Sequence, residues 1–167
     1  MIWYAISGSW RTINKEVEKD VRLIVKKIIK KGDGIITGGA LGVDYIATQE
    51  VIKNKKLNLI KIFLPINLKS FCKHYEKRAK EGIISFLQAE NICRQLIYIN
   101  NNSPNSIMVS GKFEEASEKS YYSRNSDIVK NCDKLYAFQV NDSKGTQDAI
   151  IKARELGKEV FVKKYKI

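Results

Sequence analysis

The feature of this sequence that most restricts its fold is a repeated order of segments. A short apolar run is followed by a loop of small residues and then by a helix-forming segment, as at 3–7, 8–12 and 14–31. Within 14–31 the apolar residues recur at steps of three and four, which predicts an amphipathic helix that ends at Gly32. Strands that alternate with helices require crossover connections. The chain is therefore predicted to be an α/β protein of Rossmann-like type, with a mainly parallel sheet flanked by helices.

The remaining segments follow the same order. Further strands are expected at 34–37, 59–64, 107–109, 134–140 and 159–162, and further helices at 43–51, 71–82, 114–131 and 146–156. A break in the helix near Tyr122 is left open. Another helix over 86–96 should end before the β-prone run 97–99, and a loop is expected at 100–106. The length of 167 residues fits a single domain over 1–167.

Composition argues against several classes of protein. No apolar stretch is long enough to cross a bilayer, and the first residues lack the regions of a signal peptide, so we expect a cytoplasmic protein without membrane contact. The cysteines Cys72, Cys93 and Cys132 are odd in number and widely spaced, which predicts reduced thiols. With His74 as the one histidine and no C-x-x-C motif, no metal site is predicted.

The basic charge has two interpretations. The net charge is +12 and the pI is about 9.6. Such an excess attracts nucleic acid or another polyanion. The basic residues are mostly lysines scattered along the chain, however, and the frequent isoleucine and asparagine would also follow from an AT-rich genome. Charge alone therefore leaves nucleic-acid binding and compositional bias as alternatives.

Three strand-to-helix loops carry the candidate site. In a parallel sheet they all lie at the carboxyl edge of the strands, where open α/β sheets bind ligands. Glycine lets the backbone approach a ligand closely, and free N–H groups at a helix N-terminus favour anions. The alternative is that the glycines serve turn geometry alone. We predict a phosphate-bearing ligand, contacted by Gly8, Ser9 and Arg11, by Thr37, Gly38, Gly39, Ala40, Gly42 and Asp44, and by Lys144, Gly145 and Thr146.

Side chains near these loops have competing interpretations. Arg11 and Arg124 are expected to bind phosphate through their forked guanidinium groups, with a surface salt bridge as the alternative for each. Asp44 would either bind backbone N–H groups at the helix start or meet a ribose hydroxyl. Tyr121 and Tyr122 would either stack on a base or pack in the interior.

Three further expectations concern individual side chains. A side chain added at Gly39 is expected to block the approach of an anion while the protein stays folded. His74 has no evident partner and is expected to be a surface residue. Because Ser7 and Ser9 have no base nearby, no nucleophilic triad is predicted.

The glycine loops resemble a known family. Thr37-Gly38-Gly39-Ala40-Leu41-Gly42-Val43-Asp44 resembles the S-G-G-A-x-G-x-D motif of the DNA-processing A (DprA/Smf) family. Gly8-Ser9 followed by Arg11 resembles its G-S-R loop, and Arg124-Asn125 resembles its R-N pair. Ser143-Lys144-Gly145-Thr146 and the later Gly157-Lys158-Glu159-Val160 resemble its final segments. The similarity leaves out 83–120, which is therefore expected to be a family-variable insertion.

The resemblance extends to the SLOG superfamily of Rossmann-like nucleotide-binding and nucleotide-sensing proteins. Its lysine-decarboxylase-like (LOG) branch contains phosphoribohydrolases whose G-G-x-G-T-x-x-E motif supplies a catalytic glutamate. Here Ala149 stands at the position of that glutamate, and Asp148 comes one position early. This departure argues against hydrolase chemistry, and no catalytic residue is predicted.

We therefore interpret the chain as a binding or sensing module for a nucleotide or another phosphate-bearing small ligand, held by the loops together with Arg124 and Asn125. The alternative is a DprA-like protein that binds or processes single-stranded DNA, and the second alternative is the phosphoribohydrolase. No cofactor is required beyond the nucleotide-type ligand. The expected partners are that ligand, single-stranded DNA as the alternative, and further copies of the chain in a homo-oligomer.

Overall fold

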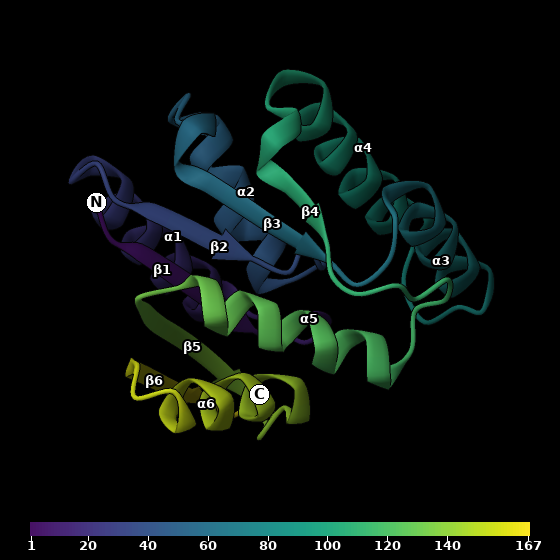
Figure 1. Ribbon diagram of the computed structural model, residues 1–167. Helices are drawn as coiled ribbons and strands as arrows, with labels where there is room; N and C mark the ends of the chain where they lie inside the picture. The colour runs from purple at the N-terminus through teal and green to yellow at the C-terminus, as the bar shows by residue number, and fades with distance from the viewer.

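The segments that alternate along the sequence form a sheet with helices on both faces (Figure 1). The computed structural model describes residues 1–167. The strands are β1 (Trp3–Gly8), β2 (Gly34–Thr37), β3 (Ile60–Leu64), β4 (Ile107–Val109), β5 (Lys134–Val140) and β6 (Glu159–Tyr165). The helices are α1 (Lys15–Lys30), α2 (Val43–Lys53), α3 (Leu68–Lys80), α4 (Phe86–Asn102), α5 (Glu118–Asn131) and α6 (Lys144–Glu155). Short 3-10 turns at Leu57–Leu59 and Pro104–Ser106 lead into β3 and β4.

The strand order creates a crevice beside β1. All six strands are parallel, in the order β4-β3-β2-β1-β5-β6. Ala5 of β1 pairs with Ile36 of β2 on one side and with Leu135 of β5 on the other. The order reverses between β1 and β5, because the chain returns from the edge strand β4 through α5. Open α/β sheets bind ligands beyond the carboxyl ends of the strands at such a switch point. The predicted Rossmann-like fold is thus confirmed, with a wholly parallel sheet.

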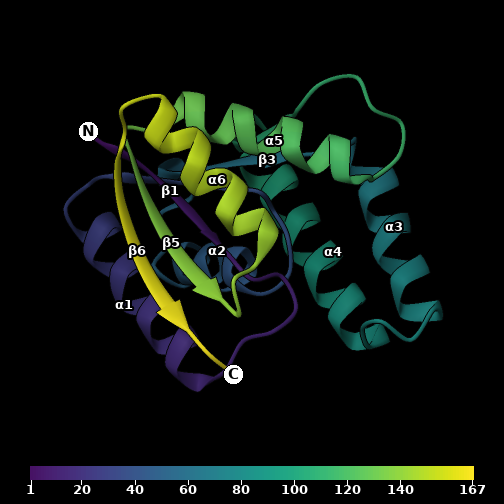
Figure 2. The ribbon, with the colours of Figure 1, turned by 90° about the horizontal axis from the view of Figure 1, so that it is seen from below.

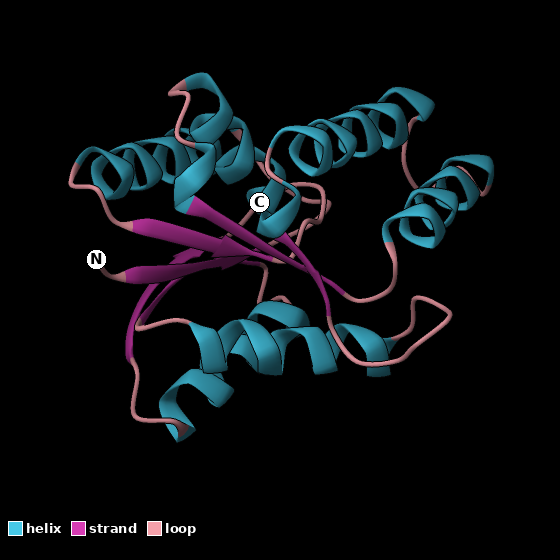
Figure 3. Cartoon of the chain, turned by 45° about the horizontal axis from the view of Figure 1, so that its top comes forward, coloured by secondary structure: helices cyan, strands magenta, loops and turns pink.

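Two hydrophobic layers cover the sheet. Helices α1 to α4 lie on one face, and α5 and α6 lie on the other (Figure 3). The neighbours Ile35 and Ile36 on β2 belong to different layers, since successive side chains of a strand point to opposite faces. Both are fully buried, which explains why the strands read as continuous apolar runs. None of the helices combines the length and apolar composition that crossing a membrane requires.

Helix α4 departs from the sequence prediction. It continues through the β-prone run 97–99 and through 100–102, where the sequence predicts a loop. Ala89, Ile92, Leu96 and Ile99 recur at steps of three and four, and all are buried. Burying this face outweighs the β propensity of three residues, because that propensity depends strongly on context.

Several other boundaries also differ from the prediction, and capping residues set two of them. Helix α5 begins at Glu118, four residues after the predicted start at 114, and runs unbroken past Tyr122. The hydroxyl of Ser117 accepts a first-turn N–H at 3.2 Å. The Asn67 side chain caps α3 in the same way at 2.9 Å, so that helix begins at 68 rather than 71. The last strand extends to Tyr165, beyond the predicted end at 162.

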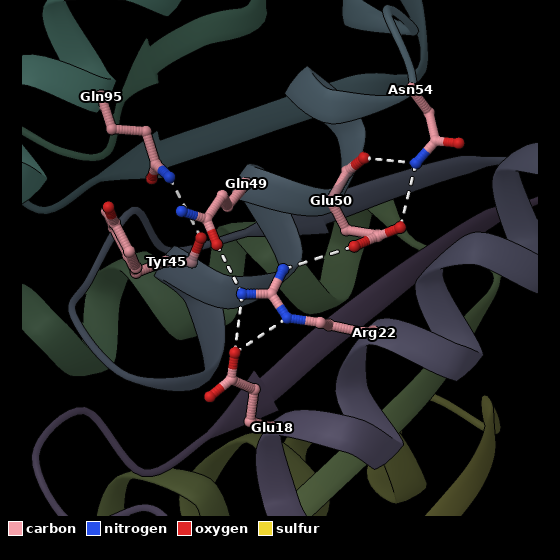
Figure 4. A network of polar contacts seen from close by, with 7 residues as sticks. All are labelled: Glu18, Arg22, Tyr45, Gln49, Glu50, Asn54 and Gln95. Carbon is pink, nitrogen blue, oxygen red and sulfur yellow. Dashed lines mark hydrogen bonds and ion pairs between the residues drawn. The ribbon is translucent and has the colours of Figure 1, made fainter. Parts of the chain in front are cut away.

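Arg22 joins α1 to α2 (Figure 4). Its guanidinium donates to Glu18 on its own helix at 2.8 Å, and to Gln49 and Glu50 on α2, the latter at 3.3 Å. Asn54 donates to the Glu50 carboxylate at 3.0 Å. Glu50 is buried, so its carboxylate oxygens need these donors in place of water.

Replacing Arg22 by methionine should weaken the fold. We expect Arg22→Met to lower the free energy of unfolding by about 1–3 kcal/mol, because Glu50 loses its charged donor while much of the apolar side chain is kept. Urea unfolding followed by circular dichroism measures this change. Lys26→Met is the matched control, since Lys26 is exposed on the same helix and carries the same charge. Equal losses in the two variants would contradict a specific role for Arg22.

Candidate functional site

A cavity of about 560 Å³ lies where the loops after β1, β2 and β5 meet. Its walls are these loops, α3, α5 and the first turn of α6. Figure 2 shows α5 and α6 side by side, with α3 next to one end of α5. The cavity therefore occupies the switch point between β1 and β5, and its volume falls in the usual range of roughly 300–1,000 Å³ for small-ligand sites.

A buried carboxylate holds the glycine-rich loop after β2. Through Oδ2, Asp44 accepts the N–H groups of Gly38 at 2.9 Å and of Ala40 at 3.3 Å. Burial raises the pKa of Asp44 to about 6, while the Arg124 guanidinium and the two N–H groups act to lower it. Of the two roles that the sequence left open for Asp44, the structure contains the backbone contacts, and the ribose contact stays a hypothesis.

Arg124 of α5 reaches the same loop. Its Nη1 donates to the Gly38 carbonyl at 2.9 Å, and its guanidinium carbon lies 5.0 Å from the centre of the Tyr121 ring, within cation–π range. Its Nε is buried and has no hydrogen-bond partner. A buried donor without an acceptor is costly. Because Arg124 lines the cavity, an anion bound there is a candidate acceptor.

The first turn of α6 forms the part of the wall that follows β5. Residues 143–146 line the cavity. Asn125 fixes this turn, since its Nδ2 donates to the Gly145 carbonyl at 3.2 Å and to Asp148 at 3.0 Å. No side chain caps the helix at Ser143. The first N–H groups of α6 therefore have no side-chain acceptor, and such free N–H groups favour an anion.

Helix α3 forms a wall that the sequence did not place at the site. His74, Tyr75 and Arg78 all line the cavity. The Nε2 atom of His74 lies 3.1 Å from the Tyr121 hydroxyl, so the expectation of a partnerless surface histidine is wrong. Burial lowers the pKa of His74, and the positive charges of Arg78 and Lys77 lower it further.

Tyr75 was also missed, although a sequence signal for its burial exists. Phe71, Tyr75 and Ala79 recur at steps of four and form the buried face of α3. The Tyr75 hydroxyl accepts the N–H of Leu41 at 3.1 Å and so supports the glycine-rich loop. This spacing of four residues indicates a buried face of α3, but no local sequence pattern indicates that α3 lies against α5.

The charges that line the cavity are mainly positive. The cations are Arg11, Arg78, Arg124 and Lys144, and the carboxylates are Asp44 and Glu118. Arg78 also pairs with Glu81 at 2.7 Å outside the cavity lining. Together with the open end of α6, this excess of positive charge favours an anionic ligand.

Four of the predicted contact residues support the loops without lining the cavity, and these are Ser9, Thr37, Gly39 and Gly42. The hydroxyl of Ser9 accepts the N–H of Thr12 at 3.0 Å. Thr37 is fully buried. A Cβ at Gly42 would lie 2.1 Å from the Ser9 carbonyl oxygen, which explains the glycine there. The other predicted residues, Gly8, Arg11, Gly38, Ala40, Asp44, Arg124, Asn125, Lys144, Gly145 and Thr146, all line it.

The expectation that a side chain at Gly39 would block the ligand's path is wrong. The φ angle of Gly39 is +65°, and its Cβ would lie 2.7 Å from Leu64 Cδ2 and 2.8 Å from Ile62 Cγ2. A substitution there would enter the hydrophobic core and disturb the fold. At Gly145, by contrast, a Cβ would meet no atom within 4 Å, although this glycine lines the cavity.

Comparison with solved structures agrees with this architecture. DNA processing protein A from Helicobacter pylori, described by its single-stranded DNA binding mode, has a TM-score of 0.69 and 20% identity over 96% of this chain and 64% of its own. DNA processing protein A from Streptococcus pneumoniae has a TM-score of 0.66 and 22% identity over 96% of this chain and 50% of its own. The protein TM1055 has a TM-score of 0.56 and 18% identity, over 96% of this chain and 72% of its own.

The chain spans between half and two thirds of the two DNA-processing structures. No model of a protein family matches the sequence, and no curated protein matches it. At these identities the likeness concerns the fold. The resemblance that the glycine loops suggested is confirmed at that level: the chain has the Rossmann-like fold found in DNA processing protein A.

Proposed function

We propose that the cavity binds a nucleotide through its phosphate and acts as a binding or sensing site. The observation that carries this proposal is the meeting of four cationic side chains and an uncapped helix N-terminus in one cavity at the switch point of the sheet. Phosphate would lie between Arg124 and the first turn of α6, where guanidinium and backbone N–H groups converge. The buried Nε of Arg124 would then gain its missing acceptor.

Aromatic side chains would hold the base. Trp10, Tyr121 and Tyr122 line the same cavity, and Trp10 is 39% exposed. Their rings offer the flat apolar faces on which bases stack. Asp148 is engaged by Asn125 at 3.0 Å and by Lys152 at 2.8 Å, while Ala149 lines the cavity. No carboxylate therefore stands where the phosphoribohydrolase motif has its glutamate, which favours binding without hydrolysis. We propose the cytoplasm as the location of the protein.

A second candidate is that the cavity holds one nucleotide of a single DNA strand. This candidate is favoured by the Helicobacter pylori structure, whose subject is single-stranded DNA binding, and by the net charge of +12. The same phosphate and base contacts would serve both ligands. The two ligands differ outside the cavity, since a DNA strand would continue over the basic surface of the protein.

Substitution of Arg124 tests the phosphate contact. Arg124→Gln should weaken nucleoside monophosphate binding roughly tenfold to a hundredfold in calorimetry, because one charged hydrogen-bond donor is lost. Lys56→Ala is the matched control, since it removes one positive charge from an exposed residue outside the cavity lining. An equal loss of affinity in both variants would mean that only overall charge matters.

A side chain at Gly145 tests the location. Gly145→Leu should abolish binding while the melting temperature stays near that of the parent, because the added side chain meets no protein atom at its Cβ. Gly39→Ala should instead lower the melting temperature, because its methyl group would enter the core at positive φ. Unchanged affinity in a folded Gly145→Leu protein would exclude this cavity as the site.

The protonation of Asp44 should make binding depend on pH. Above its pKa of about 6, Asp44 is charged and repels a bound phosphate, so affinity should rise as the pH falls from 7.5 to 5.5. The size of the effect should be roughly three- to tenfold. A dinucleoside monophosphate is the suitable ligand, because its phosphodiester does not titrate in this range. Calorimetry at several pH values measures the affinity.

The control for this pH dependence is Asp44→Asn, which keeps an oxygen acceptor for Gly38 and Ala40. It should bind tightly at pH 7.5 and lose most of the dependence, with His74 contributing the remainder below its ordinary pKa. Stability without ligand gives a second check. Because the folded-state pKa lies above the ordinary 3.8, ionisation of Asp44 should lower the free energy of unfolding as the pH rises from about 4 to 6. An unchanged pH profile in Asp44→Asn would rule out this carboxyl group.

Salt and strand preference separate the two candidates. For a small nucleotide in the cavity, we expect binding to persist at physiological salt and to depend on Arg11 and Arg124. Oligonucleotide binding should fall steeply with salt, since it would rest on loose phosphate contacts. Fluorescence anisotropy with single-stranded and duplex oligonucleotides measures both. Salt-resistant binding that prefers single strands would favour the second candidate instead.

A further inference from the structure

Two cysteines lie opposite each other in the α3–α4 hairpin. Cys72 is eight residues before the end of α3 at Lys80, and Cys93 is seven residues after the start of α4 at Phe86. At about 1.5 Å of rise per residue, the two positions stand at nearly the same distance from the connecting loop. The two helices pack side by side (Figure 1).

The two thiols lie close enough to influence each other's ionisation. Each of Cys72 and Cys93 shifts the pKa of the other, and both residues are partly exposed. The neighbouring Cys93 thiol lowers the pKa of the Cys72 thiol, against the opposing effects of burial and of the negative charge of Glu76. The pKa of Cys93 is raised by the Cys72 thiol and by burial. Cys72 is thus the thiol that more readily becomes a thiolate.

The third cysteine belongs to a different environment. Cys132 is 1% exposed and lies in the hydrophobic layer beneath α5 and α6, on the other face of the sheet from α3 and α4. Its thiol donates to the Val129 carbonyl at 3.4 Å. It is therefore shielded from solvent and separated from the other two by the sheet.

We propose that Cys72 and Cys93 form a dithiol site that low-molecular-weight disulfides oxidise to an intramolecular disulfide between α3 and α4. Two neighbouring, partly exposed thiols on two packed helices are the arrangement that such exchange requires, because a small disulfide can reach both sulfur atoms and the second thiol is near the first. The proposal is independent of the ligand in the cavity.

The exchange has two steps. The Cys72 thiolate attacks one sulfur of the small disulfide, its S–S bond breaks, and one thiolate leaves. Cys93 then gives up its proton and attacks the Cys72 sulfur of the mixed disulfide, which expels the second thiolate. The two protein thiols lose two electrons and two protons, and the small disulfide is reduced to two thiols.

The cross-link would fix α3, which forms one wall of the cavity, to α4. Helix α3 carries His74, Tyr75 and Arg78 just after Cys72, and all three line the cavity. The disulfide would tie this helix to α4, whose buried face packs in the main core. By closing a loop of 21 residues, it should raise the melting temperature by roughly 5–10 °C.

Oxidised glutathione is the probe that tests the site in the folded, full-length chain. We expect the intact mass to fall by two hydrogens, two of the three thiols to be lost, and a non-reducing peptide map to contain a Cys72–Cys93 link. A non-reducing gel should show no disulfide-linked dimer of the chain. Dithiothreitol should reverse both the mass change and the rise in melting temperature.

Single substitutions assign the order of attack. Cys93→Ser should stop at one glutathione on Cys72, because the resolving thiol is missing. Cys132→Ala should still form the link, since that residue takes no part. Four results with the wild-type protein would overturn the proposal. The protein could keep all three thiols, form a link that involves Cys132, stop at a stable glutathione adduct, or form only a link between chains.

Discussion

Parallel pairing of β1 with both β2 and β5 is the constraint on which the rest of this structure depends. It sends every connection back across a face of the sheet, so both faces must be covered by helices. It also brings the carboxyl ends of all strands to one edge, and it places the reversal of strand order beside β1. The cavity is the consequence, because the loops on either side of the reversal diverge there.

The second determinant is the polar network that connects the loops to α5. Asp44 holds the N–H groups of Gly38 and Ala40, and Arg124 binds the carbonyl of Gly38. The next residue, Asn125, binds the first turn of α6 in the same manner. One helical turn therefore positions both sides of the cavity. A bound phosphate would meet groups that are already oriented, which reduces the ordering cost of binding.

Sequence patterns and three-dimensional contacts disagreed most where a local preference competed with burial. The run Ile97-Tyr98-Ile99 has β-prone residues, yet Ile99 continues the buried stripe of α4 and the helix prevails. Gly39 and Gly145 both stand in glycine loops. The first faces Ile62 and Leu64 in the core and the second faces open space, a distinction that depends on which strands lie alongside.

The sequence by itself determined the order of strands and helices, the fold class and the three loops that meet at the sheet edge. These depend on periodicity and on turn residues, which act over a few neighbouring positions. Only the tertiary structure decided that α3 lines the cavity and that His74 meets Tyr121, a contact across 47 positions of the chain. Only it brought Cys72 to Cys93. Contacts of this kind follow from how helices pack on the sheet, and no local pattern in the sequence records that packing.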